Sequence, residues 1–124
     1  MAVKLKRIYE DRSGEDGIRV LVDGLWPRGI SKEKAGIDIW MKELAPSSEL
    51  RKWYSHDPEK WQQFREKYIH ELCGNEKLKE LFSLTDKSNV TILISSKDME
   101  ISNGEVLLEL INNRSIFNQN CGNA

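Results

Sequence analysis

The sequence lacks the features that usually mark membrane, secreted and nucleic-acid-binding proteins. Lysine and arginine number 19 against 20 aspartate and glutamate, so the formal net charge is −1. No basic excess is therefore available for nucleic acid or for an anionic membrane surface. The apolar stretches are short and interrupted by polar residues, and the N-terminal residues contain no signal-peptide core. We expect a cytoplasmic protein that binds neither nucleic acid nor a membrane.

Cysteine and histidine are also scarce. Cys73 falls on a predicted helix and Cys121 in an asparagine-rich tail, so we predict no disulfide framework and a reducing compartment. The two histidines are far apart and form none of the usual metal-ligand spacings. A magnesium ion shared by Asp23 and Asp98 beside a phosphorylated ligand is the one exception we consider. The chain has neither a P-loop nor a Gly-x-Gly-x-x-Gly motif, so any cofactor stays open.

A chain of 124 residues has the length of one domain. We predict a single α/β domain over residues 1–114, followed by a polar, frayed tail over residues 115–124. Strands are predicted over residues 4–9, 18–23, 37–43 and 90–95, although the third could instead begin a helix. Helices are predicted to begin near residues 32, 48, 58, 76 and 103, each after a capping side chain. This order predicts a small, largely parallel sheet flanked by helices, with the strand carboxyl ends along one edge.

Cations and an aromatic side chain follow the predicted strands at the edge where α/β proteins bind ligands. The helix predicted from residue 103 adds free N–H groups there, and Gly104 would let a ligand approach them closely. The predicted ligand-binding residues are Trp26, Arg28, Lys42, Arg51, Lys97, Ser102 and Asn103. They predict a pocket for a phosphate, a carboxylate or a nucleotide. In the alternative interpretation they are solvated loop charges, and Trp26 packs against neighbouring helices.

If the protein is an enzyme, Asp23 or His56 is the predicted acid/base group. An imidazole titrates near neutral pH, which suits proton transfer. However, His56 directly precedes a predicted helix cap, where histidine often serves only as a turn residue. Ser95 and Ser96 lack the Gly-x-Ser-x-Gly elbow of a nucleophilic serine.

Several segments occur in an order that resembles the YeaO-like proteins, small bacterial proteins of a broader domain of unknown function. The segments are residues 19–23 (RVLVD), 25–29 (LWPRG), 42–47 (KELAPS), 49–53 (ELRKW) and 56–58 (HDP), and the resemblance spans about residues 3–112. It implies a compact α/β fold, a cytoplasmic bacterial setting and no characterised activity. The polar motif positions implied by the resemblance fall on Asp23, Arg28, Lys42, Arg51 and Lys97.

The chain departs from the family pattern at two places. Gly24 stands where the resemblance implies an arginine, and Ser102-Asn103 stands where it implies an Asn-Asn or Asn-His pair. A cation and a polar group are therefore missing or exchanged. If the family is enzymatic, we expect this member to be weaker or altered in substrate.

Two classes of function follow. The first is a protein that binds a small anionic ligand at the strand ends, and that could also act on it as an enzyme. The second is a non-enzymatic interaction or regulatory module, which predicts an exposed apolar patch around Trp40, Trp53 or Trp61. A transcription factor is disfavoured by the charge balance. The sequence leaves the oligomeric state open.

Overall fold

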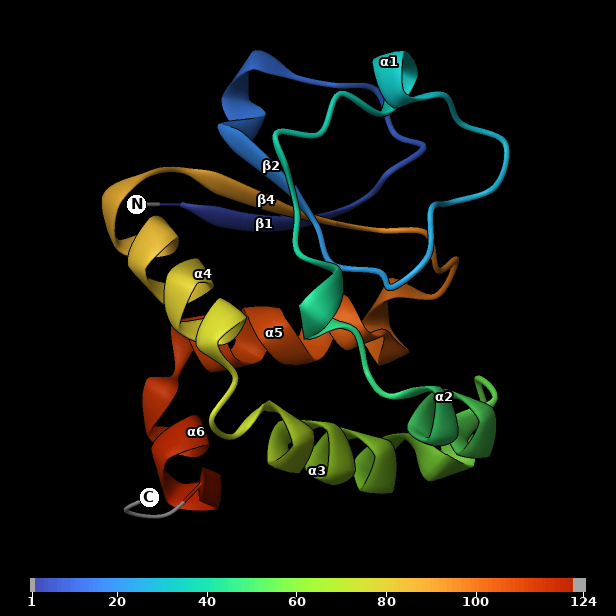
Figure 1. Cartoon of the computed structure of the whole chain (residues 1–124), viewed down its shortest axis with the longest axis vertical. Helices are drawn as coiled ribbons and strands as arrows, with labels where there is room; N and C mark the ends of the chain where they lie inside the picture. The colour runs from blue at the N-terminus through green and yellow to red at the C-terminus, as the bar shows by residue number, and fades with distance from the viewer. Residues whose placement is uncertain (1, 122–124) are drawn as a thin grey trace.

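A four-stranded parallel sheet forms the centre of the protein, in a computed structural model that describes residues 2–121 (Figure 1). The strand order is β1-β4-β2-β3, and every neighbouring pair is parallel. The strands are β1 (Val3–Arg7), β2 (Ile18–Leu21), β3 (Ile39–Trp40) and β4 (Val90–Ile94). The predicted fold class, a compact α/β domain with a largely parallel sheet, is confirmed.

The described α-helices are α1 (Lys32–Ala35), α2 (Ser48–Tyr54), α3 (Trp61–Leu72), α4 (Glu76–Lys87), α5 (Asn103–Asn112) and α6 (Arg114–Cys121). Four of them, α1, α2, α4 and α5, begin where the capping residues predict. The helix predicted from residue 58 begins instead at Trp61, after a 3₁₀ turn (Pro58–Lys60), and α6 was not predicted. The side chains of Ser31, Ser47 and Ser102 each accept a hydrogen bond from a backbone N–H in the first turn of α1, α2 and α5. None of the described helices is both long and apolar enough to cross a membrane.

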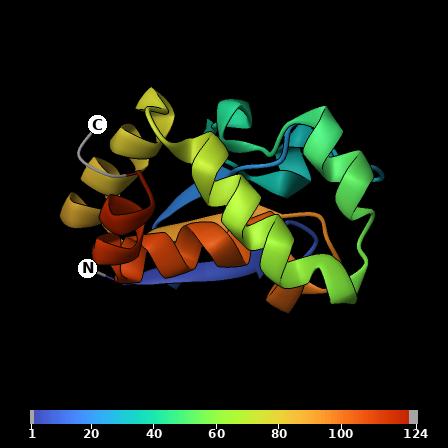
Figure 2. The same ribbon diagram turned by 90° about the horizontal axis from the view of Figure 1, so that it is seen from below.

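Different elements cover the two faces of the sheet. Helices α3 to α6 lie on one side, where α3 runs obliquely beside α5 (Figure 2). Val20, Ile92 and Ile94 point into this larger core. Leu21 and Leu93, at alternating positions, face the other side, where the chain around α1 covers them. Strands buried on both faces are typical of parallel sheets.

The third strand is shorter than predicted. We expected it over residues 37–43 with Ile37, Ile39 and Met41 on one side, but β3 contains only Ile39 and Trp40. Ile37 packs against the smaller cluster around Leu21, whereas Ile39 and Met41 pack against the larger one. After Met41 the chain turns into a 3₁₀ helix (Lys42–Leu44) that buries Leu44, and this turn ends the strand.

A buried charge network joins the N-terminal elements to the sheet. Arg19, on β2, is fully buried, and its Nη1 donates to Asp16 Oδ2. The rest of its guanidinium donates to backbone carbonyls at the end of α1, over 3.0 Å to Gly36 and 2.9 Å to Ala35. Asp16 also accepts from Lys6 Nζ, at 3.1 Å, and from the backbone N–H of Ser13, at 3.0 Å. Because both charges are paired and hydrogen-bonded, they can remain buried and ionised.

Substitution of Asp16 tests this network. Burial alone would raise the pKa of Asp16, but hydrogen bonds from Ser13, Lys6 and Arg19 outweigh burial and lower that pKa well below its ordinary value. Asp16→Asn should lower the free energy of unfolding at pH 7 by about 3–5 kcal/mol, because it leaves the Arg19 guanidinium buried without a carboxylate. Urea unfolding measures the loss, and Asp11→Asn, at an exposed position, is the control.

The stability lost in Asp16→Asn should depend on pH. Because the pKa of Asp16 is lower in the folded than in the unfolded chain, its contribution is complete above the ordinary aspartate pKa of about 4. The contribution is lost as the pH falls below that value. The stability difference between the wild type and Asp16→Asn should therefore shrink in acid. A constant difference from pH 7 to pH 2 would contradict the lowered pKa.

The C-terminal segment is a helix rather than a frayed tail. Residues 114–121 form α6, whereas residues 122–124 of the predicted tail lie outside the described residues. Ile116 and Phe117 pack against the larger core, and the Phe117 ring meets Phe82 edge-on at 5.8 Å. Two adjacent apolar residues are a weak signal inside a polar sequence, so composition alone missed this helix.

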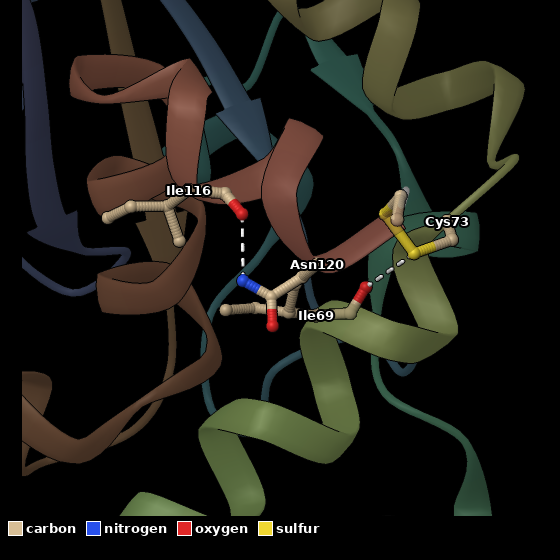
Figure 3. Close-up of a disulfide and its surroundings, with 5 residues drawn as sticks. Ile69, Cys73, Ile116 and Asn120 are labelled. Carbon is tan, nitrogen blue, oxygen red and sulfur yellow. Dashed lines mark hydrogen bonds between the residues drawn. A yellow bond between two sulfur atoms is a disulfide. The ribbon is translucent and has the colours of Figure 1, made fainter. Parts of the chain in front are cut away.

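A disulfide joins α6 to the end of α3, which corrects the prediction that Cys73 and Cys121 make no disulfide framework. Cys73 follows α3, Cys121 ends α6, and their Cα atoms are 5.4 Å apart (Figure 3). Cys73 Sγ lies 3.5 Å from the carbonyl oxygen of Ile69, and Asn120 Nδ2 donates to the Ile116 carbonyl within α6. The two cysteines are 48 residues apart in sequence, so their proximity depends on tertiary packing that spacing does not reveal.

Removal of this disulfide should be measurable. Cys73→Ser should lower the free energy of unfolding by about 2–4 kcal/mol, because the unfolded chain loses a cross-link that closes a long loop. Thermal unfolding with and without a thiol reductant provides the comparison. Reductant should lower the melting temperature of the wild type and leave Cys73→Ser unchanged. An equal response of both proteins would contradict a disulfide in solution.

Candidate functional site

A cavity of about 570 Å³ opens at the carboxyl edge of the sheet. The ends of β1, β2 and β4 form one side of it, and α2, the start of α3 and the start of α5 contribute the rest. This is the edge at which open α/β sheets bind ligands. The volume falls in the range of pockets that enclose small organic molecules.

Four cationic side chains line the cavity: Arg7, Arg28, Arg51 and Lys97. Arg7 donates to the backbone carbonyls of Ser95 and Ser96, each over 3.0 Å. The Arg28 and Lys97 side chains form no hydrogen bond with any other described residue. Within residues 2–121 none of the four cations forms a salt bridge. The cavity therefore gathers four cations that no salt bridge within the described residues pairs.

Asp23 contributes the single carboxylate among the described residues that line the cavity. It follows β2 directly, and its Oδ2 accepts from both the backbone N–H and the hydroxyl of Ser95, each at 2.8 Å. Its backbone carbonyl accepts from Trp40 Nε1 at 2.7 Å. Oδ1 has no hydrogen-bond partner within the described part of the chain. The carboxylate is thus fixed in orientation, with one oxygen free to accept a further hydrogen bond.

Aromatic side chains form the deeper wall of the cavity. Tyr54 and Phe64 are buried and stack with their ring centroids 4.2 Å apart. The Tyr54 hydroxyl donates to the Ile101 carbonyl at 2.9 Å, and burial, together with the nearby aspartates, raises the pKa of Tyr54. Trp26, on the loop that follows β2, donates from Nε1 to the Ile30 carbonyl at 2.8 Å. Each aromatic group therefore has a fixed position before any ligand arrives.

Comparison with known proteins identifies the family. A model of the family described as the inactive DUF488-N3 subclade matches residues 2–123. The chain belongs to this family. It is 39% identical over 110 residues to the uncharacterized protein YeaO of Escherichia coli K12, covering 88% of this chain and 96% of YeaO. The YeaO-like family predicted from the sequence motifs is therefore confirmed.

Mycobacterial relatives are similar over the same length. An uncharacterized protein of Mycobacterium tuberculosis H37Rv is 44% identical over 112 residues, which cover 90% of this chain and 95% of the relative. A protein of Mycobacterium bovis, also uncharacterized, matches with the same identity and coverage. No solved structure matches the chain.

Most of the residues predicted for the site meet at this cavity. Those that line it are Asp23, Trp26, Arg28, Arg51, His56, Lys97, Ser102 and Asn103. Lys42 does not line it, which corrects the prediction for that residue. Because β3 ends at Trp40, Lys42 lies in the following turn, and its ammonium sits over the Trp40 ring at 5.6 Å.

The surroundings of Gly104 and Gly24 differ from those predicted from the sequence. Gly104 packs against the sheet rather than the cavity, since a Cβ there would lie 2.6 Å from Leu5 Cδ1 and 2.9 Å from Ile94 Cγ2. It therefore does not open the start of α5 to a ligand. Gly24 does line the cavity, and a Cβ there would lie 3.7 Å from Arg51 Nη1. Arg51 therefore brings a cation close to the position where the resemblance implies one.

Some cavity residues were not predicted. Arg7 belongs to the first predicted strand, and its role at the strand end depends on the register of β1 beside β4. Phe64, on α3, is buried in the larger core and also lines the cavity. Periodicity marks a buried face and does not distinguish core from cavity lining.

The backbone at His56 is strained. Ser55 and His56 follow α2 with φ of 47° and 55°, in the left-handed region that glycine tolerates best. Exposed His56 lines the cavity, 6.1 Å from the Tyr54 ring between centroids. Such strain often accompanies functional positions, and it also fits the turn-residue interpretation.

A pair of substitutions measures this strain. His56→Gly and His56→Ala both remove the imidazole, but only glycine relieves the left-handed backbone. We expect His56→Gly to be the more stable of the two by about 1 kcal/mol in urea unfolding. Equal stability of the two variants would mean that the left-handed conformation is not retained in solution.

Proposed function

We propose that the cavity binds a small molecule that carries a phosphate or a carboxylate. The observation that supports this proposal is the grouping of four cations, none with a carboxylate partner in the described chain, around one cavity. The chain as a whole has a net charge of −1, so the positive charge is local rather than general. Keeping like charges together costs stability, and an anionic ligand would offset that cost.

The four cations would contribute in different ways. Arg28, Arg51 and Lys97 are exposed at the mouth and can move to donate charge-assisted hydrogen bonds to an anion. The guanidinium of Arg7 is already held by two carbonyls, so it contributes mainly its charge. The positive end of the α5 dipole adds to the same field, since Ser102 and Asn103 reach the cavity.

Binding without catalysis is the form of the proposal that we favour. The family is described as an inactive subclade, which argues against turnover at this site. Asp23 and His56 remain the residues that would transfer protons if chemistry occurred. The Asp23 carboxylate is engaged by Ser95 on one oxygen, as expected for a group that orients a ligand.

The interaction-module alternative receives less support. It predicts an exposed apolar patch around Trp40, Trp53 or Trp61. Trp40 is 36% exposed, but Trp53 lies under the ammonium groups of Lys60 and Lys67, at 5.1 and 5.2 Å. The Trp61 ring stacks on Phe64. Of the three tryptophans, Trp40 alone belongs to the exposed large apolar residues of the described chain.

Calorimetric titration with inorganic phosphate, phosphate monoesters and carboxylates tests the proposal. At least one anion should bind the wild type, and Arg51→Ala should weaken its binding by about tenfold or more, because a charge-assisted hydrogen bond is lost. Lys52→Ala is the matched control, since Lys52 is an exposed cation on the same helix that does not line the cavity. Absence of binding by every anion, or equal binding by the two variants, would overturn the proposal.

A further inference from the structure

We infer that the ligand is an organic anion that binds with its neutral part inward. That neutral part would be a ring that carries hydrogen-bond donors, while the phosphate or carboxylate stays at the mouth of the cavity. The inference rests on the proposed function and adds the chemical class and orientation of the ligand. A nucleoside monophosphate is a molecule of this class.

The cavity changes in polarity from its mouth to its interior. Three of its cations, Arg28, Arg51 and Lys97, are exposed side chains at the mouth. The inner wall contains Tyr54 and Phe64, which are only 5% and 2% exposed. An anionic group is best solvated beside the exposed cations, and an apolar ring gains most where water is excluded.

Asp23 reinforces this orientation. It is half-buried, and its Oδ2 is already occupied by two donors from Ser95. A phosphate placed against this carboxylate would be repelled, whereas a hydroxyl or amino group could donate to Oδ1. The Asp23 carboxylate therefore disfavours the charged end of a ligand beside it and favours a neutral end with a donor.

The dimensions of the cavity also argue for more than an inorganic ion. A volume of about 570 Å³ is suited to an organic molecule, and a bare phosphate would leave most of it filled with water. Flat side chains suit a flat ligand: Trp26 and Tyr54 line the same cavity from different segments of the chain. Stacking on such rings strengthens binding without requiring one particular heterocycle.

Four probes separate the parts of this inference: inorganic phosphate, ribose 5-phosphate, phenyl phosphate and adenosine 5′-monophosphate. They carry, in turn, the anion alone, donors without an aromatic ring, an aromatic ring without donors, and both. In calorimetric titrations of the full chain, adenosine 5′-monophosphate should bind at least tenfold more tightly than inorganic phosphate. The two intermediate probes should lie between them.

Asp23→Asn tests the orientation. It keeps the shape of the side chain and an oxygen for Ser95, but removes the negative charge. We expect it to weaken binding of adenosine 5′-monophosphate several-fold while leaving inorganic phosphate unchanged or bound more tightly. The opposite pattern, or equal loss for both probes, would overturn the inward placement of the neutral part.

The outcomes also separate this inference from the proposed function. If all four probes bind with equal affinity and Arg51→Ala weakens them all, the anion site stands and the ring-inward inference is overturned. If no probe binds, both are overturned. The comparison of probes on the wild-type chain decides the question even if Asp23→Asn fails to fold.

Discussion

The buried pair of Asp16 and Arg19 is the constraint on which the site depends. Arg19 is part of a central strand, and its guanidinium reaches the carbonyls that end α1. The segment between β2 and β3 carries Trp26 and Arg28 to the cavity. The hydrogen bonds of Arg19 hold the end of this segment against the sheet. Thr91, on β4, adds a bond from its hydroxyl to the Asp16 carbonyl at 2.8 Å. Polar contacts made outside the cavity therefore help to position one of its walls.

The site itself is arranged at a cost to stability. Four cations line one cavity without a salt bridge to any described carboxylate, and His56 keeps a left-handed backbone. Elsewhere the molecule satisfies its polar groups: among residues 2–121 no buried side-chain nitrogen or oxygen lacks a hydrogen-bond partner. Unpaired charges and backbone strain lower stability, so a surface with only a structural role does not need them. Their occurrence at one cavity is typical of a binding site.

Local signals in the sequence predicted more of the fold than of the site. Strands over residues 18–23 and 90–95 and the caps at Ser31, Ser47 and Ser102 follow from neighbouring residues alone. The burial of Arg19 could not be predicted from neighbouring residues. An arginine inside an apolar run can be buried only with a partner for its charge, and the partner, Asp16, is identified only by the structure. Lys42 was misplaced because the strand stops early, and α6 was missed because its stability comes from contacts with distant residues.

The position of β4 has a consequence for biosynthesis. β1 and β2 do not pair with each other, since both pair with β4, which joins Val90 to Val3 on one side and to Ile18 on the other. A ribosome must therefore deliver most of the chain before the first two strands find their partner. Such long sequence separations slow folding and leave unpaired strand edges open meanwhile. This protein is therefore most prone to aggregation during synthesis, after β1 and β2 have emerged and before β4 has.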